Sequence, residues 1–179
     1  MGIARASLVY DAQTVCRILG LPCLRNEEAP QAADGEIVIW CGGWTGRQLQ
    51  DTGKILLEDP RDVVAVPAGY YHTRIPLPQS NIPTRSNQLS MLKRLYPALR
   101  QLPATVGATA LAVHLGVTGE DLLQGTYCRC AEEVKLEEDV SDGYAEHLMI
   151  NIFEGLAVIS NVSDSYEGSH IYLGAARKS

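Results

Sequence analysis

The spacing of apolar residues changes several times along the chain, and each change predicts a new element. From residue 7 to residue 20 the apolar side chains recur at helical spacing and end in a glycine, which predicts an amphipathic helix. A polar loop follows over residues 25–35. The apolar run 36–41 has the composition of a buried strand.

A short helix and three strands are expected next. Thr45 and Gln48 match a capping box, which predicts that a helix starts directly after the glycine-rich turn 42–46. Three strands are predicted over residues 54–57, 63–66 and 69–77, with a turn at Asp59-Pro60 after the first. Because proline has no amide hydrogen to donate, Pro76 predicts that the third strand ends at a sheet edge.

The middle of the chain reads as helical. After an irregular loop over 78–86, a helix is expected from about residue 87 to residue 96, where Pro97 must end or kink it. A second helix is expected over 104–115, closed by Gly116. This second helix is apolar nearly all round, so it is predicted to be the buried centre of the fold.

In the C-terminal part the spacing between apolar residues shortens toward two positions, the period of a strand. Thr118 and Asp121 match another capping box and predict one more helix start. Strands are then expected over 127–134, 147–153, 156–161 and 170–175, with a hairpin turn at Glu154-Gly155. The pattern predicts an α+β fold, a single domain over residues 1–179, in which a mixed or mainly antiparallel sheet packs against the central apolar helix.

Composition excludes several classes of protein. With 179 residues, 46% of them apolar and 20% charged, the chain is neither a disordered tail nor a collagen-like or miniature disulfide scaffold. Its apolar runs are far shorter than the roughly 20 residues of a spanning helix, and no leader pattern is seen, so we expect a cytoplasmic protein that contacts no membrane. The five cysteines are expected to be reduced and mostly buried.

Charge is distributed unevenly. Residues 1–100 hold 11 basic and 9 acidic side chains, whereas residues 101–179 hold 4 basic and 12 acidic ones. The segment 63–119 contains no acidic residue. Either this segment lines a site for an anion, or the basic and acidic parts face each other within the fold or across a homodimer, or the bases are simply solvated.

The leading functional hypothesis places a binding site in this basic segment. On an alternating strand His72 and Arg74 share one face, and they could meet Arg85 under the loop 78–86. Guanidinium groups would supply paired hydrogen bonds, and Tyr71 would supply a ring or a hydroxyl. The predicted ligand is a small anion or an acidic partner surface, and the predicted site residues are His72, Arg74, Arg85, Lys93, Arg94 and Tyr71. Nucleic acid is disfavoured because the protein is acidic overall.

A competing hypothesis is an enzyme that acts on a phosphorylated small molecule. Glycines between a strand and a helix let backbone amides approach a phosphate, and the residues that could do so here are Gly42, Gly43, Thr45, Gly46 and Arg47. The turn matches neither of the common glycine-rich phosphate motifs, and a tight turn explains its glycines equally well. A third hypothesis is a structural protein that forms a charge-complementary homo-oligomer.

The cysteines and histidines predict no resident metal or cofactor. Cys128 and Cys130 point to one face of a strand, and with His147 or His170 they could supply metal ligands. A single C-x-C pair falls short of a zinc signature, so both thiols are expected to pack under the sheet. Cys41 is likewise expected to be buried rather than nucleophilic.

Overall fold

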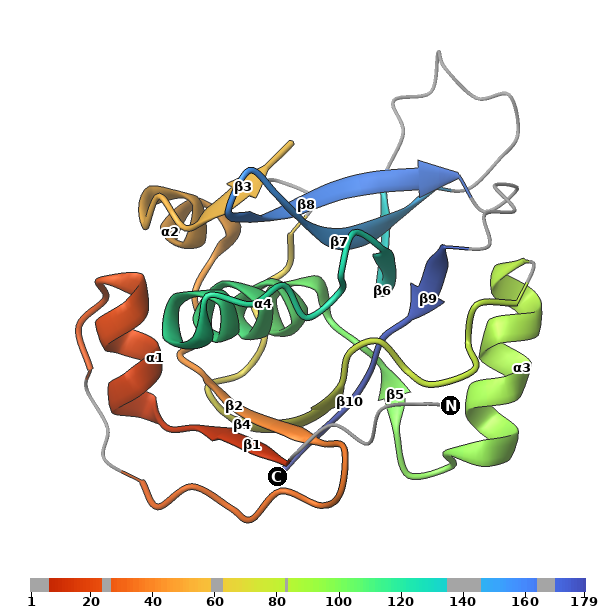
Figure 1. The fold of residues 1–179 in the computed structure, drawn as a ribbon, viewed down its shortest axis with the longest axis horizontal. Helices are drawn as coiled ribbons and strands as arrows, with labels where there is room; N and C mark the ends of the chain where they lie inside the picture. Colours follow the sequence, from red (N-terminus) through yellow and green to blue (C-terminus); the bar gives the residue numbers. More distant parts are fainter. Residues whose placement is uncertain (1–6, 24–26, 59–62, 83, 135–145, 164–169) are drawn as a thin grey trace.

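A computed structural model describes residues 7–23, 27–58, 63–82, 84–134, 146–163 and 170–179. Within these ranges the chain forms ten strands and four helices (Figure 1). The strands are β1 (Leu8–Tyr10), β2 (Ile37–Cys41), β3 (Ile55–Leu57), β4 (Gly69–Arg74), β5 (Arg100–Gln101), β6 (Tyr127–Val134), β7 (Glu146–Phe153), β8 (Leu156–Ser163), β9 (Ile171–Leu173) and β10 (Ala175–Lys178). The helices are α1 (Ala12–Leu19), α2 (Gly46–Asp51), α3 (Arg85–Leu95) and α4 (Ala104–Thr118).

The strands form two mixed sheets. The first sheet has the order β1-β2-β4-β10-β5 and is antiparallel except for the β1–β2 pair. The second has the order β3-β8-β7-β6-β9, with parallel pairs at both edges. Figure 1 shows α4 lying between the two sheets, with α1 and α3 on opposite sides of the molecule. The predicted α+β fold around a central apolar helix is therefore confirmed.

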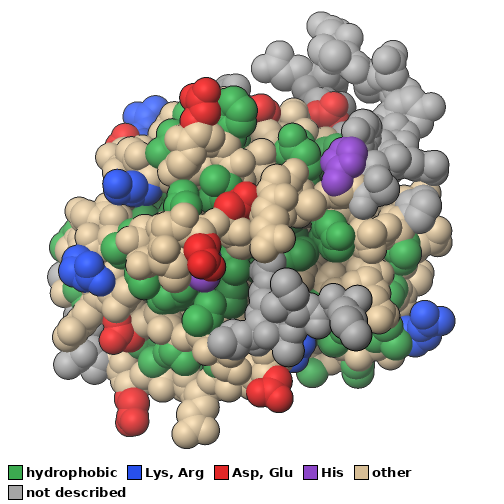
Figure 2. Space-filling view, viewed as in Figure 1, with side chains coloured by type: hydrophobic (Ala, Val, Ile, Leu, Met, Phe, Trp, Pro, Cys, Tyr) green, Lys and Arg blue, Asp and Glu red, His purple; other side chains and the backbone are tan. Residues whose placement is uncertain are grey.

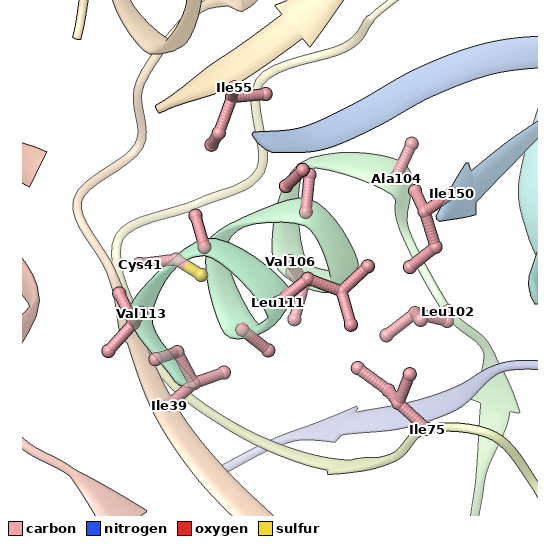
Figure 3. Close-up of a cluster of buried hydrophobic side chains, with 14 of the residues drawn as sticks. Ile39, Cys41, Ile55, Ile75, Leu102, Ala104, Val106, Leu111, Val113 and Ile150 are labelled. Atoms are coloured by element: carbon pink, nitrogen blue, oxygen red, sulfur yellow. The ribbon is translucent and has the colours of Figure 1, made fainter. Parts of the chain in front are cut away.

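Helix α4 is central because it has no polar face to expose. Every residue from Ala104 to His114 is buried, and side chains of both sheets surround it (Figure 3). The helix runs three residues further than predicted, to Thr118, and Gly119 caps it with a left-handed φ of 76°. Gly116 does not close the helix. It lies inside α4, where a Cβ would come within 2.7 Å of Ile18 on α1, so this glycine permits close helix packing.

The prediction of one helix over residues 7–20 is wrong at its start. Leu8–Tyr10 form β1, which pairs in parallel with β2, and α1 begins only after Asp11. The carboxylate of Asp11 accepts a hydrogen bond from the Thr14 amide at 2.7 Å and caps the helix. Three residues are too short a run for their period to show which element they belong to, and pairing with β2 decides it.

Two predictions around β4 are also wrong. Residues 63–66 form no strand, and Val64 is 63% exposed. Strand β4 is interior rather than at an edge, because it pairs with β2 on one side and β10 on the other. The strand stops at Arg74, so Pro76 lies beyond it and removes no hydrogen bond from the sheet. The Asp59-Pro60 turn lies outside the described residues.

The C-terminal half follows its prediction with two exceptions. β6, β7 and β8 lie where expected, and the hairpin turn has a positive φ at both Glu154 and Gly155. No helix follows Thr118: the Asp121 carboxylate instead accepts the amides of Leu123 and Gly125 in a turn. The last predicted strand is two strands, β9 and β10, which belong to different sheets. In the described part of the chain, no helix is both long and apolar enough to cross a bilayer.

Candidate functional site

Helix α3 carries three of the predicted site residues, Arg85, Lys93 and Arg94, and no acidic residue. It begins after Thr84, whose hydroxyl accepts the Asn87 amide at 3.4 Å. Its inner face packs on a small core beside the end of the sheets, formed by Leu77, Met91, Leu92, Leu99, Leu173 and Ala175. Of the polar side chains of α3, Gln88 is buried, Arg85 is half-buried and the others are exposed.

A hollow of about 390 Å³ lies on the outer side of α3, and we call it the α3 hollow. Arg85, Leu89 and Lys93 recur every four residues along it, so they share one face of the helix. Three hydroxyl side chains complete its lining, and the full set is Thr84, Arg85, Ser86, Leu89, Ser90 and Lys93. The hollow thus combines two cations with three hydroxyls, and no carboxylate of the residues that the structure describes lines it.

Arg85 is half-buried, and a residue of the neighbouring sheet holds its side chain in place. Its Nη2 donates a hydrogen bond to Oε1 of Gln101 on β5 at 3.2 Å. The side-chain amide of Gln101 in turn donates to the carbonyl of Cys130 on β6. The guanidinium is therefore oriented before any ligand arrives.

Arg94 lies in a second hollow of about 390 Å³ on the other flank of α3. Gln79, Ile82, Asn87, Ser90, Met91, Arg94 and Leu95 line it. Ser90 belongs to both hollows and marks the ridge between them. The structure therefore brings Arg85 and Lys93 together, and places Arg94 beside them but across this ridge.

His72 lies elsewhere, in a polar cluster in which it and Glu36 are buried and Arg177 is exposed. Its Nδ1 is 3.0 Å from Oε2 of Glu36, and Nη2 of Arg177 lies 3.5 Å from the same oxygen and 3.3 Å from Nδ1. Burial by itself raises the pKa of Glu36, but the hydrogen bonds from His72 and the Ala33 amide and the charge of Arg177 outweigh it and lower the pKa. His72 is therefore partnered by a carboxylate from outside the basic segment.

Arg74 and Tyr71 are also engaged away from the α3 hollow. Arg74 donates to the carbonyl of Asp34 at 3.0 Å, and its guanidinium carbon lies 5.8 Å from the centre of the Tyr96 ring. Tyr71 is buried, and its hydroxyl donates to the Pro67 carbonyl at 2.7 Å. On the face shown in Figure 2, Lys and Arg side chains lie apart from one another, in no single basic patch.

The glycine-rich turn has a packing explanation. A Cβ on Gly42 would lie 2.5 Å from the ring of Trp44 and 2.9 Å from that of Trp40. These two rings meet edge to face, with centres 5.4 Å apart. Gly43 adopts a left-handed φ of 76° that turns the chain toward α2. The predicted capping box at Thr45 is confirmed, α2 has only six residues, and Arg47 on it is exposed.

The predicted burial of Cys41, Cys128 and Cys130 is confirmed. Burial raises the pKa of the Cys41 thiol to about 12 and also raises the pKa of the Cys128 thiol, so neither forms a thiolate readily. His114 is satisfied in the core, with its Nδ1 2.6 Å from the Tyr10 hydroxyl. Among the described residues, no group of three His, Cys, Asp or Glu side chains is arranged to hold a metal ion.

Sequence reasoning missed the three hydroxyls of the α3 hollow and the role of Gln101. It placed the start of the helix at residue 87, so Arg85 and Ser86 counted as loop. Counted from Arg85, positions four, five and eight residues further along are Leu89, Ser90 and Lys93. This helical spacing is the signal that could have found the lining of the hollow.

The chain matches no family model, no curated protein and no solved structure. What the protein does must therefore be inferred from its own fold and from the chemistry of the α3 hollow.

Proposed function

We propose that this protein binds a small anionic ligand, one that carries a phosphate or carboxylate group, in the α3 hollow. The observation that carries the proposal is the lining itself: among the described residues, Arg85 and Lys93 face a hollow whose other polar side chains are hydroxyls, with no acid among them. A site without carboxylates suits an anion because nothing in its lining repels the ligand or neutralises the bases.

The two bases have different roles. The planar guanidinium of Arg85 offers paired N–H donors that match two oxygens of a phosphate or carboxylate, and Gln101 already orients it. Lys93 acts as an exposed point charge that adjusts to the ligand. The hydroxyls of Thr84, Ser86 and Ser90 can donate to the remaining ligand oxygens. The mechanism is recognition without a covalent step.

The other hypotheses stay predictions. An acidic partner surface would use the same bases and also Arg94, which lines the neighbouring hollow. The phosphate-turn enzyme has no observation in its favour beyond its glycines, and of these Gly42 is explained by tryptophan packing and Gly43 by its left-handed φ. A charge-complementary homodimer remains a prediction for the oligomeric state.

Calorimetric titration of the full chain at low salt tests the proposal, with inorganic phosphate first and then a sugar phosphate, a nucleotide and a dicarboxylate. We expect Arg85→Ala and Lys93→Ala each to weaken binding at least about tenfold, since a hydrogen bond to a charged group contributes roughly 1.5–3 kcal/mol. Arg47→Ala removes the same charge from an exposed site on α2 and should leave binding unchanged. Equal loss in all three variants would mean diffuse attraction to net charge, and would contradict a built site.

A further inference from the structure

The chain reverses sharply after α1. Gly20 caps the helix with a left-handed φ of 68°, and its amide donates to the carbonyl of Cys16. The amide of Leu21 donates to the same carbonyl at 2.9 Å. These two hydrogen bonds fold the following residues back along the last turn of the helix.

The reversal brings two cysteines together. The thiol of Cys16 lies 3.7 Å from the carbonyl oxygen of Pro22, the residue before Cys23. The Cys16 and Cys23 side chains are close enough that Cys23 raises the pKa of the Cys16 thiol. Cys16 is only 2% exposed, whereas Cys23 is exposed. Cys23 is therefore accessible to a reagent in solution, and the buried Cys16 lies next to it.

We propose that Cys16 and Cys23 form a thiol–disulfide exchange site that reacts with a low-molecular-weight disulfide such as oxidised glutathione. The Cys23 thiolate attacks one sulfur of the oxidised glutathione and expels one glutathione thiolate, which leaves a mixed disulfide on Cys23. Cys16 then loses its proton and attacks the Cys23 sulfur, and the second glutathione leaves. Two protein thiols are oxidised to one disulfide, and one glutathione disulfide is reduced to two thiols.

Burial assigns the order of these steps. It raises the pKa of the Cys16 thiol to about 12, and the contact with Cys23 adds to the rise, so Cys16 is not the first to react. Cys23 is the exposed member and meets the reagent. The other cysteines, Cys41, Cys128 and Cys130, are buried, and this keeps the reaction at one pair.

This site is separate from the α3 hollow. Figure 1 shows α1 and α3 on opposite sides of α4, so anion binding and thiol exchange can succeed or fail independently. A Cys16–Cys23 disulfide would tie the last turn of α1 to the segment that follows it. Because the buried face of α1 includes Cys16 and Leu19, the bond would form at the edge of the core.

The test is to incubate the full chain with reduced or with oxidised glutathione, block the remaining thiols with iodoacetamide, digest with trypsin without reduction, and analyse the peptides by mass spectrometry. Arg17 lies between the two cysteines, so trypsin separates them into peptides 6–17 and 18–25. We expect these peptides to be unlinked in reduced glutathione and predominantly cross-linked in oxidised glutathione. Cys41, Cys128 and Cys130 should carry no glutathione in either sample.

Two variants separate the steps. Cys16→Ser should stop at the mixed disulfide, with one glutathione on peptide 18–25. Cys23→Ser changes an exposed residue and should lose both the cross-link and any glutathione on peptide 6–17. The proposal is overturned if the native chain also stops at the mixed disulfide, if Cys23 stays unmodified, or if the cross-link joins another pair of cysteines.

Discussion

At the scale of single residues, the cluster of Glu36, His72 and Arg177 shows how a carboxylate can be buried. Glu36 is 5% exposed and accepts from His72, from the Ala33 amide and from Arg177. Removing such a carboxylate from water is costly unless its oxygens are hydrogen-bonded. The Ala33 amide is local, but His72 and Arg177 lie 36 and 141 positions further along the chain, so the cluster of side chains exists only in the folded state.

We predict that Glu36→Gln lowers the free energy of unfolding near neutral pH by about 1–3 kcal/mol, because the partners lose a charged acceptor. The folded-state pKa of Glu36 lies below its ordinary value of 4.5. Its contribution is therefore present above pH 4.5 and is lost as the pH falls through the folded-state pKa. Urea denaturation of both proteins near pH 7 and at about pH 3 should show the difference shrink in acid.

The exposed carboxyl of Glu28 provides the control. Glu28→Gln should have the unfolding free energy of the native chain at both pH values, because that side chain is exposed. A difference between native and Glu36→Gln proteins that is independent of pH would mean that the Glu36 charge does not stabilise the fold.

At the scale of elements, α4 is capped by a strand. Pro103 at its N-cap makes no side-chain hydrogen bond to the helix. Both carboxylate oxygens of Glu132 on β6 instead accept from the Ala104 amide, at 3.0 and 2.9 Å. Burial raises the pKa of Glu132, although the Ala104 amide opposes that rise. A long-range contact thus satisfies a helix-start amide that the local sequence leaves open.

Glu132→Ala is expected to lower the free energy of unfolding by about 1–2 kcal/mol, the cost of losing a helix cap. Glu133→Ala is the matched control, since Glu133 is the next residue of β6 and is exposed. Denaturant titrations of the two variants should place the Glu132→Ala midpoint well below the native one and leave the Glu133→Ala midpoint in place. Equal midpoints in the two variants would show that α4 needs no cap at this end.

At the scale of the whole molecule, the fold depends on how closely α4 approaches the sheets. A Cβ on Gly107 would overlap Cδ1 of Ile150 on β7 and would lie 2.8 Å from Leu102. The helix therefore needs a residue without a side chain at this point. Ala104 to His114 are buried on all sides, so the helix has little room to move away.

Gly107→Ala should therefore destabilise the protein by about 1–3 kcal/mol, the usual cost of overpacking. In an ordinary helix the same change would stabilise by roughly 0.5–1 kcal/mol. Thermal melting of Gly107→Ala shows whether the change stabilises or destabilises the protein. Ile150→Val removes the Cδ1 methyl that the new side chain meets. The double variant should therefore lose less stability than the sum of the losses in the two single variants. A higher melting temperature for Gly107→Ala alone would contradict this close packing.

Prediction from the sequence succeeded where the signal was local. The all-apolar run of α4, the capping box of α2 and the two-residue turn between β7 and β8 are each encoded within a few neighbouring positions. It failed where pairing across the chain decided the outcome. Leu8–Tyr10 became a strand through β2, and the interior position of β4 depends on β10, a strand about a hundred residues further along.

The candidate site divides in the same way. The acid-free basic segment is visible in the sequence, and it contains Arg85 and Lys93 of the α3 hollow. His72 was expected beside them because it lies in the same segment, but strand register sets it opposite Arg177 and next to the start of β2. Charge counted along a chain does not say which charges meet in space, because each strand pairing brings in residues from elsewhere.

By itself the sequence determined the type of most elements and the identity of the buried helix, because helix and strand periods and caps depend on neighbouring residues. Tertiary structure alone decided that the strands divide into two sheets, that Glu132 caps α4, that Gln101 holds Arg85, and that Cys23 returns to Cys16. These contacts depend on where the packed core leaves room and on which backbone edges meet, and no short stretch of sequence contains that information.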